Sequence, residues 1–171
     1  MSILGLGNDI VNIKRIEKII KNNKKKFLLK ILHKDEKKFK KLTANIIAKK
    51  FAAKEAFAKA LGTGIGKYIQ FKEICINHTK NGAPKIKFDK SVEKRILAKL
   101  KIKKVKVFLS ISDDYPFALA TVIISTWQFN EKKIIRKFKN IIYCINLSSD
   151  YKIIFITAFL HTCLLYTSDA A

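Results

Sequence analysis

Two acidic side chains lie where a charge is unexpected, and a lysine follows one of them along the chain. Asp9 falls within the apolar run 3–11, and Glu55 falls within an alanine-rich segment that reads as a buried helix. An ionised carboxylate is costly to desolvate unless a cation meets it. Lys59 comes four residues after Glu55, so both residues share one face of a helix. Together these residue types could hold a metal ion with an anion beside it.

The sequence leaves two explanations for Glu55 open. In the first, Lys59 neutralises Glu55 as an i,i+4 ion pair, a common arrangement worth about 0.2–0.5 kcal/mol. In the second, Glu55 binds a metal ion and Lys59 is left to hold an anion. Helix chemistry by itself favours the ion pair, and what favours the metal ion lies elsewhere in the chain.

The helix that carries Glu55 is predicted to begin near Thr43 and to stop at Gly62. A threonine hydroxyl can accept a hydrogen bond from the free N–H groups of a first turn, and glycine tolerates the left-handed backbone that ends many helices. The loop that follows, Gly62-Thr63-Gly64, offers backbone N–H groups. Such loops can cradle phosphates, although a helix stop is the more common use of this pattern.

Asp9 is predicted to lie on a strand over residues 3–11. Gly5 and Gly7 inside this strand indicate the close approach of another backbone or of a ligand. Asn12 can cap the helix that follows, whose isoleucines share one face. The opposite face carries cations, which form either a solvated surface or a docking surface for an acidic partner: Lys14, Arg15 and Lys18.

The rest of residues 1–125 alternates between strand and helix patterns. A basic loop over 22–26 is expected before a short apolar segment. Further elements are expected in the order strand, strand, helix, strand, strand, with an Asn-Gly hairpin turn between the first two: 71–77, 85–88, 92–100, 105–112 and 117–124. This order predicts an α+β domain of mixed helices and antiparallel hairpins over residues 1–125.

Residues 126–171 differ in character and are predicted to be a C-terminal extension outside this domain. The apolar run 153–166 is too short to predict a transmembrane helix. The final nine residues, 163–171, resemble strings left by translating sequencing adapter, so a non-native origin is an alternative for the extension. We expect no functional residue in it.

The chain is strongly basic, with a formal net charge of +23 over 171 residues. Such a charge implies an acidic partner, and a basic nucleic-acid-binding module is the main alternative function. Against that alternative, the cations are dispersed, and neither a strand of stacking aromatics nor a recognition-helix signature is present. We therefore expect neither a nucleic-acid partner nor a membrane partner.

The cysteines and histidines form no recognisable metal or disulfide framework. Cys75, Cys144 and Cys163 are widely separated and odd in number, which indicates a reducing cytoplasm. His33 has no second ligand at metal-site spacing and is expected to be a surface residue. The N-terminus lacks a basic region followed by a long apolar core, so no secretory signal is predicted.

Three blocks of the sequence, taken together, resemble the holo-acyl-carrier-protein synthases, which are small bacterial phosphopantetheinyl transferases. The blocks are ILGLGNDIV (3–11) with the helix after it, KFAAKEAFAKALGTGI (50–65), and VFLSISD (107–113) with the strand over 118–124. The second block is the most specific. The resemblance covers about residues 1–125, and the blocks follow the family's order.

The resemblance implies a reaction and a site. Family members move the 4′-phosphopantetheine arm of coenzyme A onto a serine of apo-acyl carrier protein, and adenosine 3′,5′-bisphosphate leaves. Asp9 and Glu55 would hold Mg²⁺, which suits hard oxygen ligands, and would thus be the catalytic residues. Lys59 and the Gly62-Thr63-Gly64 loop would bind coenzyme A. The serine's proton would go to Glu55 or to a water on the metal, and the sequence does not choose between them.

The resemblance also implies partners and an assembly. Arg15, with Lys14 and Lys18, matches the face that meets the acidic carrier protein in the family. The family is trimeric, so a homotrimer is expected. One departure is Asp113, which stands where many members have histidine.

Overall fold

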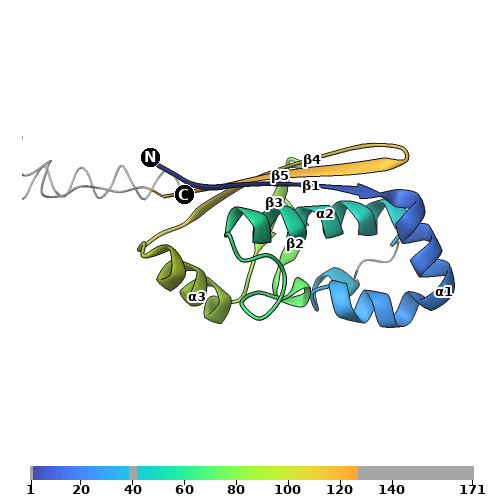
Figure 1. Cartoon of the computed structure of the whole chain (residues 1–171), viewed down its shortest axis with the longest axis horizontal. Helices are drawn as coiled ribbons and strands as arrows, with labels where there is room; N and C mark the ends of the chain where they lie inside the picture. Colours follow the sequence, from blue (N-terminus) through green and yellow to red (C-terminus); the bar gives the residue numbers. More distant parts are fainter. Residues whose placement is uncertain (1, 39–41, 127–171) are drawn as a thin grey trace, which may run out of the picture. The chain divides into compact units, whose positions relative to one another are not determined.

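The computed structural model describes residues 2–38 and 42–126. The expectations made for residues 127–171 lie outside the described residues. Within them, mixed helices and antiparallel strands confirm the predicted α+β class (Figure 1).

A three-stranded antiparallel sheet forms one layer of the domain. Its strands are β1 (Ser2–Asn12), β4 (Lys106–Asp114) and β5 (Phe117–Thr126), in the order β1-β5-β4. The N-terminal strand therefore pairs with the last described one, and Asp9 lies opposite Ala120. Side chains alternate across a strand, so Asp9 shares a face of β1 with Gly5 and Gly7.

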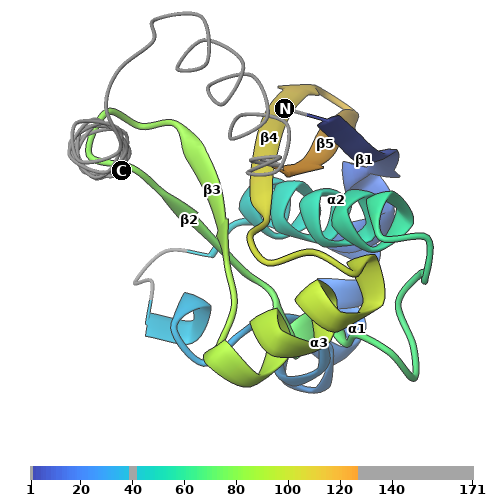
Figure 2. The same cartoon turned by 90° about the vertical axis from the view of Figure 1, so that its left-hand side faces the viewer.

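Helix α2 (Ala44–Ala60) packs along the inner face of this sheet (Figures 1 and 2). It begins where predicted, because the Thr43 hydroxyl accepts a hydrogen bond from the N–H of Ile46 at 3.3 Å. The helix is buried on several faces, and its backbone at Ala56 and Ala60 lies closest to β1. It is the centre of the apolar core, to which Phe57 contributes the largest buried apolar side chain.

Helix α1 (Ile13–Ile31) is longer than predicted. The Asn12 side chain caps it, accepting from the N–H of Lys14 at 2.9 Å. The basic loop expected over 22–26 is instead helical, with a kink at Asn23 (φ −153°, ψ 58°). Lysine is a good helix former, and Phe27 and Leu28 beyond the kink pack against the core, which holds the second half in place. The prediction of a loop there was wrong.

Short elements complete the second layer. They are two 3₁₀ turns, η1 (Glu36–Lys38) and η2 (Phe71–Glu73), a hairpin of β2 (Cys75–His78) and β3 (Pro84–Lys87), and helix α3 (Lys90–Leu100). The predicted hairpin turn is confirmed, with Gly82 in the left-handed region (φ 82°). β5 runs to Thr126, whose hydroxyl donates to the Lys104 carbonyl oxygen at 2.8 Å.

The outer face of the sheet is apolar and exposed. Its large side chains come from all three strands: Leu6 and Ile10 from β1, Phe108 from β4, and Phe117 and Leu119 from β5. Leu6 and Ile10 keep 66 % and 63 % of their surface exposed.

None of the described helices is long and apolar enough to span a bilayer.

Candidate functional site

Two glycines allow β1 to pack closely against α2, which places Asp9 of β1 near Glu55 and Lys59 of α2. A Cβ atom on Gly5 would lie 2.0 Å from the carbonyl oxygen of Ala60. On Gly7 it would lie 2.2 Å from the Ala56 carbonyl oxygen and 2.5 Å from the Ala60 nitrogen. The close approach predicted from these glycines is thus confirmed, and the partner is the backbone of α2. Asp9, two residues further on the same face, meets the helix where Glu55 and Lys59 emerge.

Lys59 pairs with Asp9. Its Nζ donates to Oδ1 of Asp9 at 2.8 Å, and the two side chains keep 51 % and 14 % of their surface exposed. Among residues 2–38 and 42–126, Lys59 forms its ion pair with Asp9 and not with Glu55, its i,i+4 neighbour. The site therefore holds two carboxylates from two elements and one lysine.

The electrostatics of Glu55 reflect this arrangement. Burial raises the pKa of its half-buried carboxyl, the negative charge of Asp9 raises it further, and Lys59 opposes both effects. Like charges raise a carboxyl pKa only when they lie near each other. Asp9 and Glu55 are therefore close enough to repel, and a bound cation would relieve that repulsion.

The Gly62-Thr63-Gly64 loop ends α2 with its own hydrogen bonds. The N–H groups of Thr63 and Gly64 both donate to the Ala58 carbonyl oxygen, at 3.1 Å and 3.2 Å, and the N–H of Gly62 donates to that of Lys59. Gly62 and Gly64 have positive φ angles of 68° and 60°. These N–H groups cap the helix, which agrees with the helix-stop alternative.

The three predicted docking cations lie at the start of α1. Lys14, Arg15 and Lys18 are all exposed. Lys14 Nζ lies 5.6 Å from the centroid of the Tyr115 ring, and the N–H of Ile13 donates to the Pro116 carbonyl oxygen at 2.8 Å. The start of α1 is therefore tied to the turn between β4 and β5.

Asp113, near the C-terminal end of β4, is hydrogen-bonded to two side chains of α2. It accepts hydrogen bonds from Asn45 Nδ2 at 2.8 Å and from Lys49 Nζ at 3.0 Å. These two bonds hold the pKa of its carboxyl below the usual range. Asp113 thus fastens the hairpin to the first half of α2, away from the C-terminal half that carries Glu55 and Lys59.

Sequence reasoning missed a second polar cluster. His33 was expected on the surface, but only 4 % of it is exposed, and Glu36 is fully buried. His33, Asp35 and Cys75 also bring three ligand atoms within 4.8 Å of one another. This trio is poorly suited to a metal ion, because His33 Nδ1 accepts from the N–H of Asp35 and the Asp35 carboxylate pairs with Lys38. The sequence offered no signal, since these partners are brought together only by folding.

The sequence matches a known family over most of the described domain. The 4′-phosphopantetheinyl transferase superfamily matches residues 5–120. The chain belongs to this superfamily, as the resemblance predicted, and it is a transferase.

Curated relatives narrow the match within the superfamily. A holo-acyl-carrier-protein synthase of Ruthia magnifica is 42 % identical over 127 residues, covering 72 % of this chain and 98 % of the relative. One of Orientia tsutsugamushi is 39 % identical over 128 residues, covering 72 % and 97 %. The family inferred from the three sequence blocks is confirmed.

Solved structures of holo-acyl-carrier-protein synthases are also similar to this chain. The holo-acyl-carrier-protein synthase of Neisseria meningitidis has 38 % identity and a TM-score of 0.65, covering 73 % of this chain and 100 % of that one. That of Helicobacter pylori, solved in complex with coenzyme A, has 40 % identity and a TM-score of 0.62, covering 70 % and 99 %.

Proposed function

We propose that Asp9, Glu55 and Lys59 form the centre at which this transferase moves the 4′-phosphopantetheine arm of coenzyme A to a serine of apo-acyl carrier protein. In this reaction the serine oxygen bonds to the phosphorus next to the pantetheine arm. The bond from that phosphorus to the adenosine 3′,5′-bisphosphate leaving group breaks. The observation that carries the proposal is the meeting of two carboxylates, from β1 and α2, beside one lysine.

The residues at this centre fit Mg²⁺. Two carboxylates are typical Mg²⁺ ligands, and their mutual repulsion is what a cation would remove. Lys59 occupies Oδ1 of Asp9, while Oδ2 accepts no hydrogen bond from the described residues. We assign Asp9 and Glu55 as the ligands. Bound there, the ion would supply positive charge to the diphosphate of coenzyme A as its bond breaks.

Lys59 and the Gly62-Thr63-Gly64 loop are proposed to bind coenzyme A. Lys59 is half exposed, so its ammonium can turn from Asp9 to an incoming phosphate. Its place one turn after Glu55 puts that positive charge next to the reacting diphosphate. The Gly62-Thr63-Gly64 loop would lie along the nucleotide, making contact through its surface and not through its capping N–H groups.

The proton of the serine hydroxyl needs an acceptor. Glu55 or a water held at the metal pair would take it. A cation bound by Asp9 and Glu55 would lower the pKa of Glu55, because its positive charge opposes the effect of Asp9.

A transfer assay tests the function directly. The protein is incubated with coenzyme A, Mg²⁺ and an apo-acyl carrier protein, and the carrier is weighed by mass spectrometry. We expect the phosphopantetheine mass increase, and we expect EDTA to prevent it. Salt-sensitive binding to arbitrary DNA or RNA without any transfer would instead support the nucleic-acid alternative.

The cations at the start of α1 are proposed to dock the carrier protein. We expect Arg15→Glu to raise KM for the carrier about tenfold or more, while KM for coenzyme A changes less than twofold, because Arg15 lies on the surface and not at the metal pair. Lys94→Glu, the same type of reversal on exposed α3, is the control. Equal losses for both substrates would exclude Arg15 as a docking residue.

A homotrimer is proposed through the exposed apolar face of the sheet. That face carries large side chains from β1, β4 and β5, and other copies of the chain would remove them from water. We expect Leu119→Lys, on the central strand of this face, to give monomers in sedimentation equilibrium, whereas Asn81→Lys in the exposed β2–β3 turn leaves the trimer intact. A Leu119→Lys protein that stays trimeric would place the interface elsewhere.

The catalytic domain is proposed to occupy residues 1–125, with an extension after it. We expect a protein that ends at Gln128, which keeps the whole of β5, to transfer phosphopantetheine at an unchanged rate and to stay soluble. The cut is placed beyond β5 because Thr126 pairs with Ser2 and its hydroxyl donates to the Lys104 carbonyl oxygen. A marked fall in melting temperature or precipitation would show that the extension belongs to the core.

We place this reaction in the cytoplasm. Cys75, the cysteine that lies within the described residues, is a buried free thiol. Burial raises its pKa, which keeps it protonated and unreactive. A structural thiol of this kind suits a reducing compartment.

A further inference from the structure

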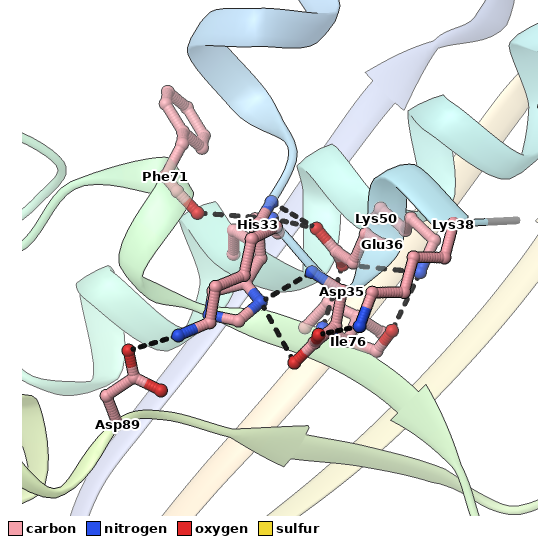
Figure 3. Close-up of polar contacts among 10 residues, drawn as sticks. His33, Asp35, Glu36, Lys38, Lys50, Phe71, Ile76 and Asp89 are labelled. Carbon is pink, nitrogen blue, oxygen red and sulfur yellow. Dashed lines mark hydrogen bonds and ion pairs between the residues drawn. The ribbon is translucent and has the colours of Figure 1, made fainter.

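Glu36 is fully buried and accepts four hydrogen bonds from three different segments (Figure 3). Its Oε1 accepts from Lys50 Nζ at 3.2 Å and from the N–H of Ile76 at 2.8 Å. Its Oε2 accepts from Lys54 Nζ and from the N–H of His33 at 2.9 Å. Each carboxylate oxygen thus has two donors, and two of the four are lysines on α2.

Lys54 is as completely bonded as Glu36. Its Nζ donates to Glu36 and to the carbonyl oxygens of Ile31 and Phe71, at 2.8 Å and 3.1 Å. An ammonium has three N–H donors, and here all of them are used. Burial lowers the pKa of Lys54, and the charge of Glu36 opposes that effect. The network therefore joins α2 to the end of α1, to η1 and to η2.

This anchor and the proposed metal pair lie on different faces of one helix. At 3.6 residues per turn, the pair Lys50 and Lys54 and the pair Glu55 and Lys59 point roughly 140° apart around α2. The backbone at Ala56 and Ala60 meets the glycines of β1 on another side. The glycines set how close α2 comes to Asp9, but backbone contact by itself gives little resistance to rotation about the helix axis. The bonds of Asp113 to Asn45 and Lys49 hold the first half of α2. Two lysines hydrogen-bonded to one buried carboxylate resist rotation closer to Glu55.

The magnitude of such a rotation matters for the site. A side-chain terminus lies roughly 5–6 Å from the helix axis, so a rotation of about 10° moves it by about 1 Å. A misplacement of about 1 Å in a catalytic group can cost on the order of 10²-fold in rate. The orientation of α2 is therefore as important to the placement of Glu55 as its distance from β1.

We propose that Glu36 is a positioning residue for the transfer reaction: by binding Lys50 and Lys54 it fixes the rotation of α2 and so holds Glu55 opposite Asp9. The inference rests on the proposed function of Asp9 and Glu55 as the metal pair. Its action is mechanical: Glu36 binds the two lysines of α2, and within the described residues it makes no hydrogen bond to Asp9 or Glu55.

Two variants of Glu36 test this. Glu36→Gln keeps the size of the side chain but removes its charge, and Glu36→Asp keeps the charge but withdraws it by one methylene. The control is Ile96→Ala, which empties a fully buried position on α3 and destabilises the fold without touching the anchor. All proteins are compared at a temperature where circular dichroism shows them folded.

The first readout is metal binding without turnover. Mn²⁺ is titrated in the presence of coenzyme A, with no carrier protein, and free Mn²⁺ is measured by electron paramagnetic resonance. We expect Mn²⁺ to bind roughly tenfold more weakly to Glu36→Gln and about threefold more weakly to Glu36→Asp. Ile96→Ala should bind Mn²⁺ like the parent protein despite its lower melting temperature. Because Glu36→Asp keeps the charge, its loss cannot be an effect of net charge.

The second readout separates positioning from docking. We expect kcat to fall on the order of 10–100-fold in Glu36→Gln, with KM for the carrier protein changed less than twofold. If Glu36→Gln does not fold, Glu36→Asp alone decides the question. Normal Mn²⁺ binding and normal kcat in folded Glu36→Asp or Glu36→Gln would overturn the proposal.

Asp9→Asn separates a failure of the metal pair from a failure of the role of Glu36. If Asp9→Asn also binds Mn²⁺ normally, the metal pair itself is wrong, and the positioning role falls with it. If Asp9→Asn loses Mn²⁺ while both Glu36 variants keep it, the metal pair stands and only the role of Glu36 is wrong.

Discussion

Asp9→Asn and Glu55→Gln are each expected to abolish the Mg²⁺-dependent transfer, lowering kcat/KM by on the order of 10²–10³-fold or more. Each removes one of the two charged oxygen ligands while keeping the size of the side chain. The fold should survive. Asp9→Asn breaks only a partly exposed ion pair, and Glu55→Gln removes a half-buried charge that is costly to keep.

The measurement is the carrier mass shift over time, together with a melting curve for each variant. Glu93→Gln, which neutralises an exposed carboxylate on α3, is the matched control and should behave like the parent. Near-normal turnover in either site variant would remove that residue from the metal pair. A lower melting temperature in Glu55→Gln would show that its charge is compensated better than the structure indicates.

Gly7→Ala is expected to be strongly damaging although it adds a single methyl group. Its Cβ would lie 2.2 Å and 2.5 Å from backbone atoms of α2, which cannot turn away as a side chain can. Either β1 or α2 must shift, at a cost on the order of 1–3 kcal/mol or more. Because Asp9 lies two residues further along β1, that shift separates Asp9 from Glu55. We expect a lower melting temperature and a large loss of kcat in the protein that remains folded.

Gly66→Ala is the control for this prediction. A Cβ on Gly66 would have no neighbour within 4 Å, so its effects on stability and transfer should be small. Unfolding in denaturant and the transfer assay, measured on both variants, give the comparison. Gly7→Ala with parental stability and rate would mean that β1 and α2 approach each other with room to spare.

The sequence by itself identified the candidate metal ligands and the elements that carry them. Asp9 and Glu55 were recognisable because each is a carboxylate among mainly apolar and alanine residues, which is a local property. The Thr43 cap and the close approach at Gly5 and Gly7 were likewise predictable, since capping and the lack of a side chain act within a few residues. The family resemblance added the reaction, which the matches to known proteins support.

Only the tertiary structure decided which groups meet. Lys59 pairs with Asp9, 50 residues away, and not with its helical neighbour Glu55. The loop predicted over 22–26 is part of a kinked helix, because the half of the helix beyond the kink packs against the core. Glu36 meets Lys50, Lys54 and Ile76 across 14, 18 and 40 residues. Such contacts depend on how whole elements pack, and packing is set by burial of the entire core, which no short stretch of sequence contains.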